Sequence, residues 1–227
     1  MTAAVSLVLF LGFTGCAGRA HADDATGEAG FTPLFNGKDL AGWFYGSRGG
    51  KVSKAGEGYR IDADRGVLYC TEKDGGTLLT EKEYANFILR LEFKLTPGAN
   101  NGIALRAPRA GNIAYDGIEL QILDDTAEKY AKLRPEQYHG SIYDTVAAQR
   151  GHLKPVGEWN EQEVIVDGRR IKVILNGATI VDANLADVKD EAKLKKHPGL
   201  TRTTGHLGFL GHGTALEFRN VRIKELP

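Results

Sequence analysis

Asn101-Gly-Ile-Ala-Leu-Arg106 and Asp116-Gly-Ile-Glu-Leu-Gln-Ile-Leu-Asp124 are the two segments that decide the fold of this chain. Both alternate along their length, and successive side chains of a β-strand point to opposite faces of a sheet. One face of the pair is therefore apolar and directed toward a core. The other face carries the side chains of Arg106, Glu119 and Gln121, which form either a solvated outer surface or the floor of a binding cleft. We favour the cleft.

Short strands separated by turn signals fill most of the remaining sequence. The clearest is Phe87–Leu95, in which every second residue is apolar, while Asp167-Gly168 and Asn176-Gly177 are typical of tight turns between strands. Two short surface helices are expected at Thr126–Leu133 and Leu185–Lys195. Many strands and little helix predict an all-β jelly-roll sandwich. The predicted strands are Trp43–Phe44, Tyr59–Ile61, Val67–Cys70, Thr77–Thr80, Phe87–Leu95, Gly102–Arg106, Gly117–Leu123, Gly140–Tyr143, Glu163–Val166, Arg170–Asn176, Thr179–Asp182, Gly205–Leu210 and Leu216–Lys224.

Length and charge limit the classes of function. The 227 residues suffice for one domain with a sizeable core. Lysine plus arginine equals aspartate plus glutamate, at 29 each, so the formal net charge is zero. Such a chain has no excess positive charge to attract nucleic acid or an acidic membrane surface, and neither is expected as a partner.

The N-terminus is interpreted as an export signal over residues 1–22, followed by a polar tether over 23–30 and one domain over 31–227. The apolar run Val5–Phe13 is too short to span a bilayer. Phe13-Thr-Gly-Cys16 resembles a lipoprotein box, which would place a lipid anchor on Cys16, and Ala20-His-Ala22 resembles an ordinary cleavage site. The predicted location is the periplasm or, through the anchor, the membrane surface of a bacterium. Cys70, at the end of an apolar run, is expected to be a buried structural thiol.

Seven segments in order together resemble one family, the 3-keto-disaccharide hydrolases, from about Phe31 to the end of the chain. The resemblance implies a concanavalin-like jelly roll and cleavage of 3-keto-glucosides by 1,2-elimination, followed by hydration of the 3-keto-2-hydroxyglucal. It also implies an upstream sugar 3-dehydrogenase that supplies the oxidised glucoside. Family members often carry glutamine where this chain has Leu210, so one polar contact to the sugar would be missing. The segments are Leu34–Trp43, Thr80–Phe87, Asn101–Arg106, Ile118–Asp124, Gly140–Tyr143, Lys154–Asn160 and Gly211–Asn220.

Such an elimination needs a base for the proton on C2, a donor for the enolate oxygen on C3 and an acid for the leaving group. Arg106 could stabilise the enolate or sit in a surface salt bridge. Glu119 could be the base, an acceptor for a sugar hydroxyl, or a partner of Arg106. His139 could be base or acid, or an exposed loop residue. His212 lies between two glycines, which permit close approach of a ligand, and is the other acid or base candidate.

The other candidate site residues would bind the sugar. Gln121 could hold hydroxyl groups but cannot exchange a proton. Tyr143, Asn160 and Asn101 could do the same, and Trp43 is either a core residue or a platform under a sugar ring.

No cofactor is expected, since the chain lacks a dinucleotide fingerprint and the tight ligand spacings of known metal motifs. Asp124 and Asp125, close to Glu119 in sequence, could supply oxygens to a calcium ion, but nothing else in the sequence supports a metal.

Two other functions compete with elimination. One is a non-catalytic carbohydrate-binding module, which Leu210 and the scarcity of convincing acids favour. The other is a retaining glycoside hydrolase, for which Glu119 and Asp124 would supply the two carboxyl groups. A retaining mechanism needs those groups about 5–5.5 Å apart, and aspartate reaches less far than glutamate.

Overall fold

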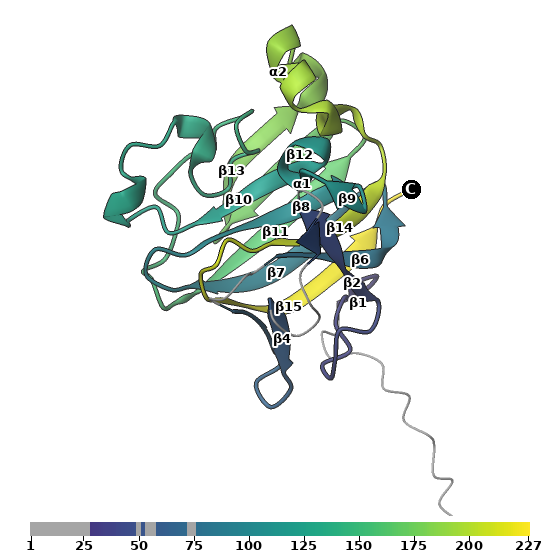
Figure 1. Ribbon diagram of the computed structural model, residues 1–227, viewed down its shortest axis with the longest axis vertical. Coiled ribbons are helices and arrows are strands. Elements are labelled where there is room, and N and C mark those ends of the chain that lie inside the picture. The colour runs from purple at the N-terminus through teal and green to yellow at the C-terminus, as the bar shows by residue number, and fades with distance from the viewer. Residues whose placement is uncertain (1–27, 49–50, 53–57, 72–75) are drawn as a thin grey trace, which may run out of the picture.

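The protein folds into two antiparallel β-sheets that pack face to face, as Figure 1 shows for the computed structural model. The structure describes residues 28–48, 51–52, 58–71 and 76–227. The predicted export signal, Cys16 and most of the predicted tether lie outside the described residues. Among those residues, no helix has both the length and the apolar character needed to cross a membrane.

One sheet has eight strands, and β7 and β15 lie at its centre. Its order is β13-β12-β11-β7-β15-β5-β4, with β1 added alongside β15. The bounds are β1 Thr32–Pro33, β4 Tyr59–Asp62, β5 Val67–Cys70, β7 Phe87–Leu95, β11 Trp159–Asp167, β12 Arg170–Leu175, β13 Ala178–Asn184 and β15 Leu216–Glu225.

The other sheet has seven strands and carries the two segments that decide the fold. Its order is β10-β8-β14-β6-β2-β3, and β9 pairs with β2. The bounds are β2 Trp43–Arg48, β3 Lys51–Val52, β6 Thr77–Tyr84, β8 Asn100–Ala107, β9 Ala110–Gly111, β10 Ile118–Leu123 and β14 Gly205–Leu210. The helix α1 (Ile113–Asp116) contacts β8 and β10.

The core lies between the two sheets and is built by the alternation that the sequence displays. Along β7 every second residue from Phe87 to Leu95 is buried, and the residues between them face outward. From the other sheet Ile103, Leu105 and Leu120 enter the same core, each with no exposed surface. The predicted all-β jelly roll is therefore confirmed.

The predictions for individual elements differ from the structure in several places, and the short strands β1, β3 and β9 were not predicted. Gly140–Tyr143 is a loop that contacts β10 through an isolated bridge between Leu120 and Ile142. The first predicted helix shrinks to the 3-10 turn η1 (Glu128–Tyr130), and the second divides into η3 (Leu185–Asp187) and α2 (Glu191–Lys196), which lies at the top of Figure 1. The helix α1 was not predicted from the sequence.

Cys70 lies in the core, as expected. It has no exposed surface, and its sulfur lies 3.5 Å from the side-chain nitrogen of Asn101. Burial raises the pKa of the Cys70 thiol to about 11. A thiolate is therefore not formed at neutral pH, which excludes Cys70 as a nucleophile in the folded protein.

Candidate functional site

The antiparallel pair β8–β10 places Glu119 and Gln121 on the face of the seven-stranded sheet that points away from the core. Glu119 lies opposite Ala104 and Gln121 opposite Gly102. Although they face outward, both side chains are buried, at 3% and 5% exposure. This face is therefore covered, and the covering elements decide whether it holds a site.

The loop Gly140–Tyr143 covers one side of this face, because it pairs with the free edge of β10. The amide of Tyr143 donates to the carbonyl of Glu119 at 2.9 Å, and the amide of Gly140 donates to the carbonyl of Gln121 at 2.8 Å. The backbone amide of Gln121 in turn donates to the carbonyl of Ser141 at 3.0 Å. This pairing explains why the segment resembles a strand in sequence, and it holds Tyr143 beside the polar face.

A cavity of about 120 Å³ remains between this loop, α1 and the sheet. A narrower slot of about 20 Å³ adjoins it. The cavity is lined by Asn100, Asn112, Ala114, Tyr115, Glu119, Gln121, Tyr143 and His212. The slot is lined by Thr77, Asn112, Ile113, Ala114, Glu119, Leu210 and His212.

Glu119 and His212 face each other where the cavity and the slot meet. Nε2 of His212 lies 3.8 Å from Oε1 of Glu119, and the His212 side chain is 26% exposed, so it borders solvent. Gly102 makes room for the carboxylate, since a Cβ at that position would come within 2.1 Å of Oε1. The sheet therefore holds a carboxylate against an imidazole that reaches it from the loop after β14.

Three acceptor oxygens around the cavity are buried and lack a hydrogen-bond partner in the described part of the chain. They are Oδ1 of Asn100, Oε1 of Glu119 and Oε1 of Gln121. Buried polar atoms in folded proteins are nearly always paired, and leaving one unpaired costs about 1–3 kcal/mol. A group of unpaired acceptors in one cavity is therefore complementary to a ligand with several hydroxyl donors.

Tyr143 adds a donor to the same cavity. Its hydroxyl oxygen accepts a hydrogen bond from Nε2 of Gln137 at 3.1 Å, so its own proton can be donated elsewhere. The structure thus brings together Glu119, Gln121, Tyr143 and His212 of the predicted site.

The structure adds three site residues that the sequence analysis missed. Asn100 shares a strand face with Gly102 and Ala104, so the alternation of β8 could have identified it. Asn112 and Tyr115 come from α1 and the turn before it, a segment without a comparable pattern in the sequence.

Arg106 does not reach the cavity, which corrects its expected role at the enolate. Its backbone φ of 48° breaks the alternation at the end of β8. The guanidinium is buried and donates to the carbonyls of Ala85, Gly168 and Arg202 at 2.7–3.1 Å. Arg106 therefore ties together three connections that are remote in sequence, and no carboxylate of Glu119 pairs with it in the described structure.

His139 is also misplaced by the sequence analysis, because its ring enters the core. Its Nδ1 accepts a hydrogen bond from the amide of Leu123 at 3.3 Å, and its ring packs against Phe93 of the opposite sheet. Burial lowers the pKa of His139 to about 3. The imidazole is therefore neutral at ordinary pH and remote from the cavity lining, so it serves neither as base nor as acid for a ligand there.

We expect His139 to make the protein less stable at acidic pH. Its pKa is about 3 in the folded state and near 6.5 when unfolded, so between these values the unfolded chain binds more protons. The stabilisation is complete above pH 6.5 and is lost as the pH falls through this window. Between pH 7 and pH 5 this one residue should remove about 2 kcal/mol of unfolding free energy.

Urea unfolding of the wild type and His139→Asn at both pH values checks this expectation. The asparagine oxygen can replace Nδ1 as acceptor for Leu123 but does not titrate. The wild type should lose about 2 kcal/mol more than the variant between pH 7 and pH 5. Equal losses would contradict the assignment of His139 to the core.

The remaining predicted sugar contacts are structural. The side-chain amide of Asn101 donates to the hydroxyl of Tyr59 inside the core. Nε1 of Trp43 donates to the carbonyl of Leu34 at 2.8 Å, and its ring stacks on Phe35. Asn160 lies on β11 of the eight-stranded sheet. Its side-chain oxygen accepts hydrogen bonds from the amide of Lys154 and the side chain of Asn176. These three side chains make hydrogen bonds within the fold and do not line the cavity.

The carboxylates considered for a metal or for a second catalytic acid are bound elsewhere. Asp124 accepts from the amides of Gly98 and Thr126, and Asp125 accepts from the amide of His139. Among the described residues, no group of three or more His, Cys, Asp or Glu is placed to hold a metal ion. Glu119 is the one carboxylate among the described residues that line the cavity and slot, so a retaining pair is not formed.

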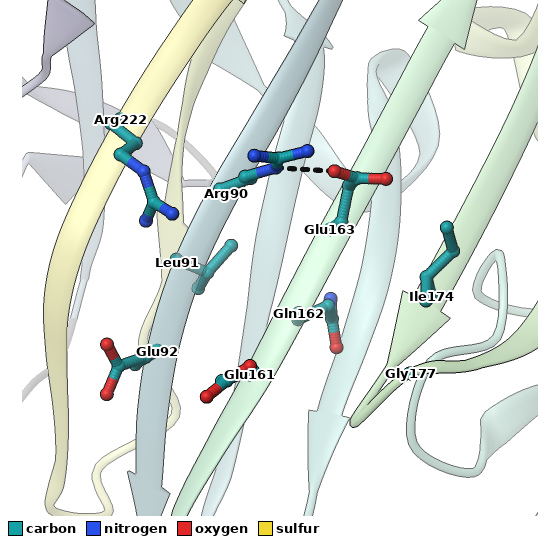
Figure 2. Close-up of a pocket in the computed structure, with 9 residues that line it drawn as sticks. All are labelled: Arg90, Leu91, Glu92, Glu161, Gln162, Glu163, Ile174, Gly177 and Arg222. Atoms are coloured by element: carbon teal, nitrogen blue, oxygen red, sulfur yellow. Dashed lines mark hydrogen bonds and ion pairs between the residues drawn. The ribbon is translucent and has the colours of Figure 1, made fainter. Parts of the chain in front are cut away.

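A larger hollow of about 380 Å³ lies on the outer face of the other sheet. Figure 2 shows the side chain of Arg90, on β7, directed toward Glu163, on β11. Nε of Arg90 lies 2.5 Å from Oε2 of Glu163. Glu92, also in its lining, pairs with Arg219 at 2.6 Å. The carboxylates of Glu92 and Glu163 are compensated by guanidinium groups and lie on the opposite side of the molecule from Glu119, so this hollow lacks the carboxylate–imidazole pair of the candidate site.

Comparisons with known proteins show what this chain is similar to. The family model described as a 3-keto-alpha-glucoside-1,2-lyase-like domain matches residues 30–224. A 3-keto-disaccharide hydrolase of Bacteroides thetaiotaomicron is 27% identical over 87% of this chain and 79% of its own length.

Solved structures show the same architecture. A crystal structure of a predicted glycosyl hydrolase from Parabacteroides distasonis is 28% identical, with a TM-score of 0.72 over 86% of this chain and 99% of that one. A Bacillus subtilis protein with a galectin-like fold, 14% identical, has a TM-score of 0.55 over 86% of this chain and 94% of that chain. At that identity, the second likeness concerns the fold alone.

Proposed function

Because this chain belongs to the family of 3-keto-alpha-glucoside-1,2-lyase-like domains, we propose that it is a carbohydrate-active enzyme that cleaves 3-keto-glucosides by 1,2-elimination. The observation that carries the proposal is the Glu119–His212 pair, 3.8 Å apart at the edge of a cavity with three unpaired acceptor oxygens. The acceptors suit the hydroxyl groups of a sugar. The pair suits the transfer of one proton away from the sugar and one proton toward it.

In the first step Glu119 removes the proton on C2, which the neighbouring ketone at C3 makes acidic. The electron pair of the broken C2–H bond forms the C1=C2 double bond through an enolate, and the C1–O bond breaks. His212 donates a proton to the departing oxygen. The products are the 3-keto-2-hydroxyglucal and the free alcohol, so the step needs no external oxidant or reductant.

The enolate oxygen on C3 needs a donor, and Tyr143 takes the role that the sequence analysis gave to Arg106. Its hydroxyl already accepts from Gln137 and can donate its proton into the cavity. A donor placed in advance where negative charge develops stabilises the transition state more than the ground state. Gln121 and Asn100 would then hold sugar hydroxyls through their unpaired oxygens.

In the second step water adds across the C1=C2 bond of the glucal. Its oxygen bonds to C1 and a proton returns to C2, which gives the 3-keto sugar. Glu119, protonated in the first step, exchanges its proton with solvent and then supplies a solvent-derived proton to C2, while His212 borders solvent and can accept a proton from the water. The same two groups thus exchange roles between the steps.

The source of the substrate and the location of the protein are also part of the proposal. The ketone must be made by a sugar 3-dehydrogenase that acts before this enzyme, since the elimination itself neither oxidises nor reduces its substrate. The apolar run Val5–Phe13 and Cys16 support export to the periplasm, free or through a lipid anchor.

Incubation with a 3-keto-glucoside in deuterated water tests the proposal. Elimination produces ultraviolet absorbance from the conjugated enone, and mass spectrometry should find deuterium at C2 of the hydrated product. The corresponding unoxidised glucoside, which lacks the acidifying ketone, should remain intact. Binding without enone or deuterium would identify a carbohydrate-binding module, and release of sugar from the unoxidised glucoside would identify an ordinary glycosidase.

A further inference from the structure

The two parts of the site differ in polarity. The lining of the larger cavity includes five residues with amide or phenol groups: Asn100, Asn112, Tyr115, Gln121 and Tyr143. The slot that adjoins it at Glu119 and His212 has one apolar wall, made by Ile113, Ala114 and Leu210, and its other lining residues are Thr77 and Asn112. The proton-transfer pair therefore lies between a polar cavity and the apolar wall of the slot.

The apolar wall is part of a second hydrophobic cluster, outside the main core. Ile113 and Leu210 pack there with Leu79, Ala104 and Ala107. Leu210 is 6% exposed and Ile113 is 2% exposed, so neither side chain can turn readily to solvent. A rigid wall of this kind selects by shape and polarity, because burying a hydroxyl against it without a hydrogen bond costs about 1–3 kcal/mol.

This asymmetry fixes the direction in which a glycoside can bind. The sugar ring, with a hydroxyl on nearly every carbon, finds the three unpaired acceptor oxygens in the cavity of about 120 Å³. The bond to the leaving group starts at C1, next to the C2 proton that Glu119 removes. The leaving group must then extend past the pair, toward the slot.

We propose that the slot beside Leu210 makes this enzyme selective for 3-keto-glucosides whose leaving group is a small, aliphatic alcohol. This inference rests on the proposed elimination. The slot holds about 20 Å³, which is the space of one water-sized group and suits a terminal methyl group. Leu210 is thus a specificity-determining residue: it favours an alkyl end and disfavours a hydroxylated one.

A matched pair of substrates tests this inference. The 3-keto derivatives of n-propyl glucoside and 3-hydroxypropyl glucoside have leaving groups of similar basicity and differ by one terminal hydroxyl. The wild type should show a kcat/KM about 10-fold or more higher for the propyl compound, the range in which an apolar pocket discriminates a single group. Leu210→Gln should reduce this ratio to about twofold or less, since its amide can pair with the hydroxyl.

Leu210→Met is the control, because methionine keeps the apolar character and nearly the volume of leucine, so the preference should persist. Equal kcat/KM values for the two substrates in the wild type, or a preference that survives in Leu210→Gln, would overturn the inference and leave the elimination intact. If neither substrate gives enone, the proposed function fails instead. Calorimetry with the two unreacted compounds then tests the slot, and equal affinities would overturn it.

Discussion

Glu119→Gln is expected to lower kcat for elimination by about 10²- to 10⁴-fold, the range attributed to a positioned general base. Glutamine keeps the size of glutamate and its place above Gly102, but it cannot take the proton from C2. Deuterium incorporation at C2 should fall together with enone formation, because both follow the same proton removal. Stopped-flow absorbance and mass spectrometry on a 3-keto-glucoside measure the two effects.

The matched control is Glu161→Gln, a change of the same chemistry at an exposed glutamate on the other sheet. It should leave both readouts at the wild-type level. If Glu119→Gln retained wild-type deuterium exchange, the base would have to be another group, and His212 would be the first alternative because it shares the cavity edge.

Arg106→Met is expected to lower the free energy of unfolding by about 3–5 kcal/mol, because hydrogen bonds to a charged donor contribute about 1.5–3 kcal/mol each and several are lost together. The substitution leaves the carbonyls of Ala85, Gly168 and Arg202 without this donor. Urea unfolding measures the change. Activity of the folded fraction should remain, since the guanidinium lies outside the cavity lining.

Arg109→Met provides the comparison for the loss of an arginine from the surface. Arg109 is exposed and pairs with Glu81 at 3.1 Å, and exposed pairs contribute about 0.2–1 kcal/mol. The loss of unfolding free energy should therefore be several-fold larger for Arg106→Met than for Arg109→Met. An Arg106→Met protein with wild-type stability and no activity would restore the catalytic role that the sequence predicted.

Much of the fold could be predicted because alternation reports directly on burial. In Phe87–Leu95 the apolar residues follow a period of two, and each of them is buried. The loop at Gly140–Tyr143 was mistaken for a strand because it does pair with β10, although only through an isolated bridge. The helix α1 has four residues, too short for a helical period to be recognised.

The site could be predicted only in part, and the errors have identifiable causes. Alternation placed Glu119 and Gln121 correctly, and the same rule would have sent Asn101 to the core beside Ile103. It failed for Arg106 because a single residue with positive φ redirects the side chain. His139 lies in a connection, and nothing in the sequence tells whether a loop side chain turns toward solvent or between the sheets.

The buried thiol of Cys70 can be used to measure how often the folded domain opens. With no exposed surface, and a pKa raised to about 11 by burial, it can meet an alkylating reagent only after the structure around it opens. The rate at which iodoacetamide modifies Cys70 under native conditions therefore measures how often β5 becomes accessible. Comparing this alkylation rate between the wild type and a variant shows which protein opens more often.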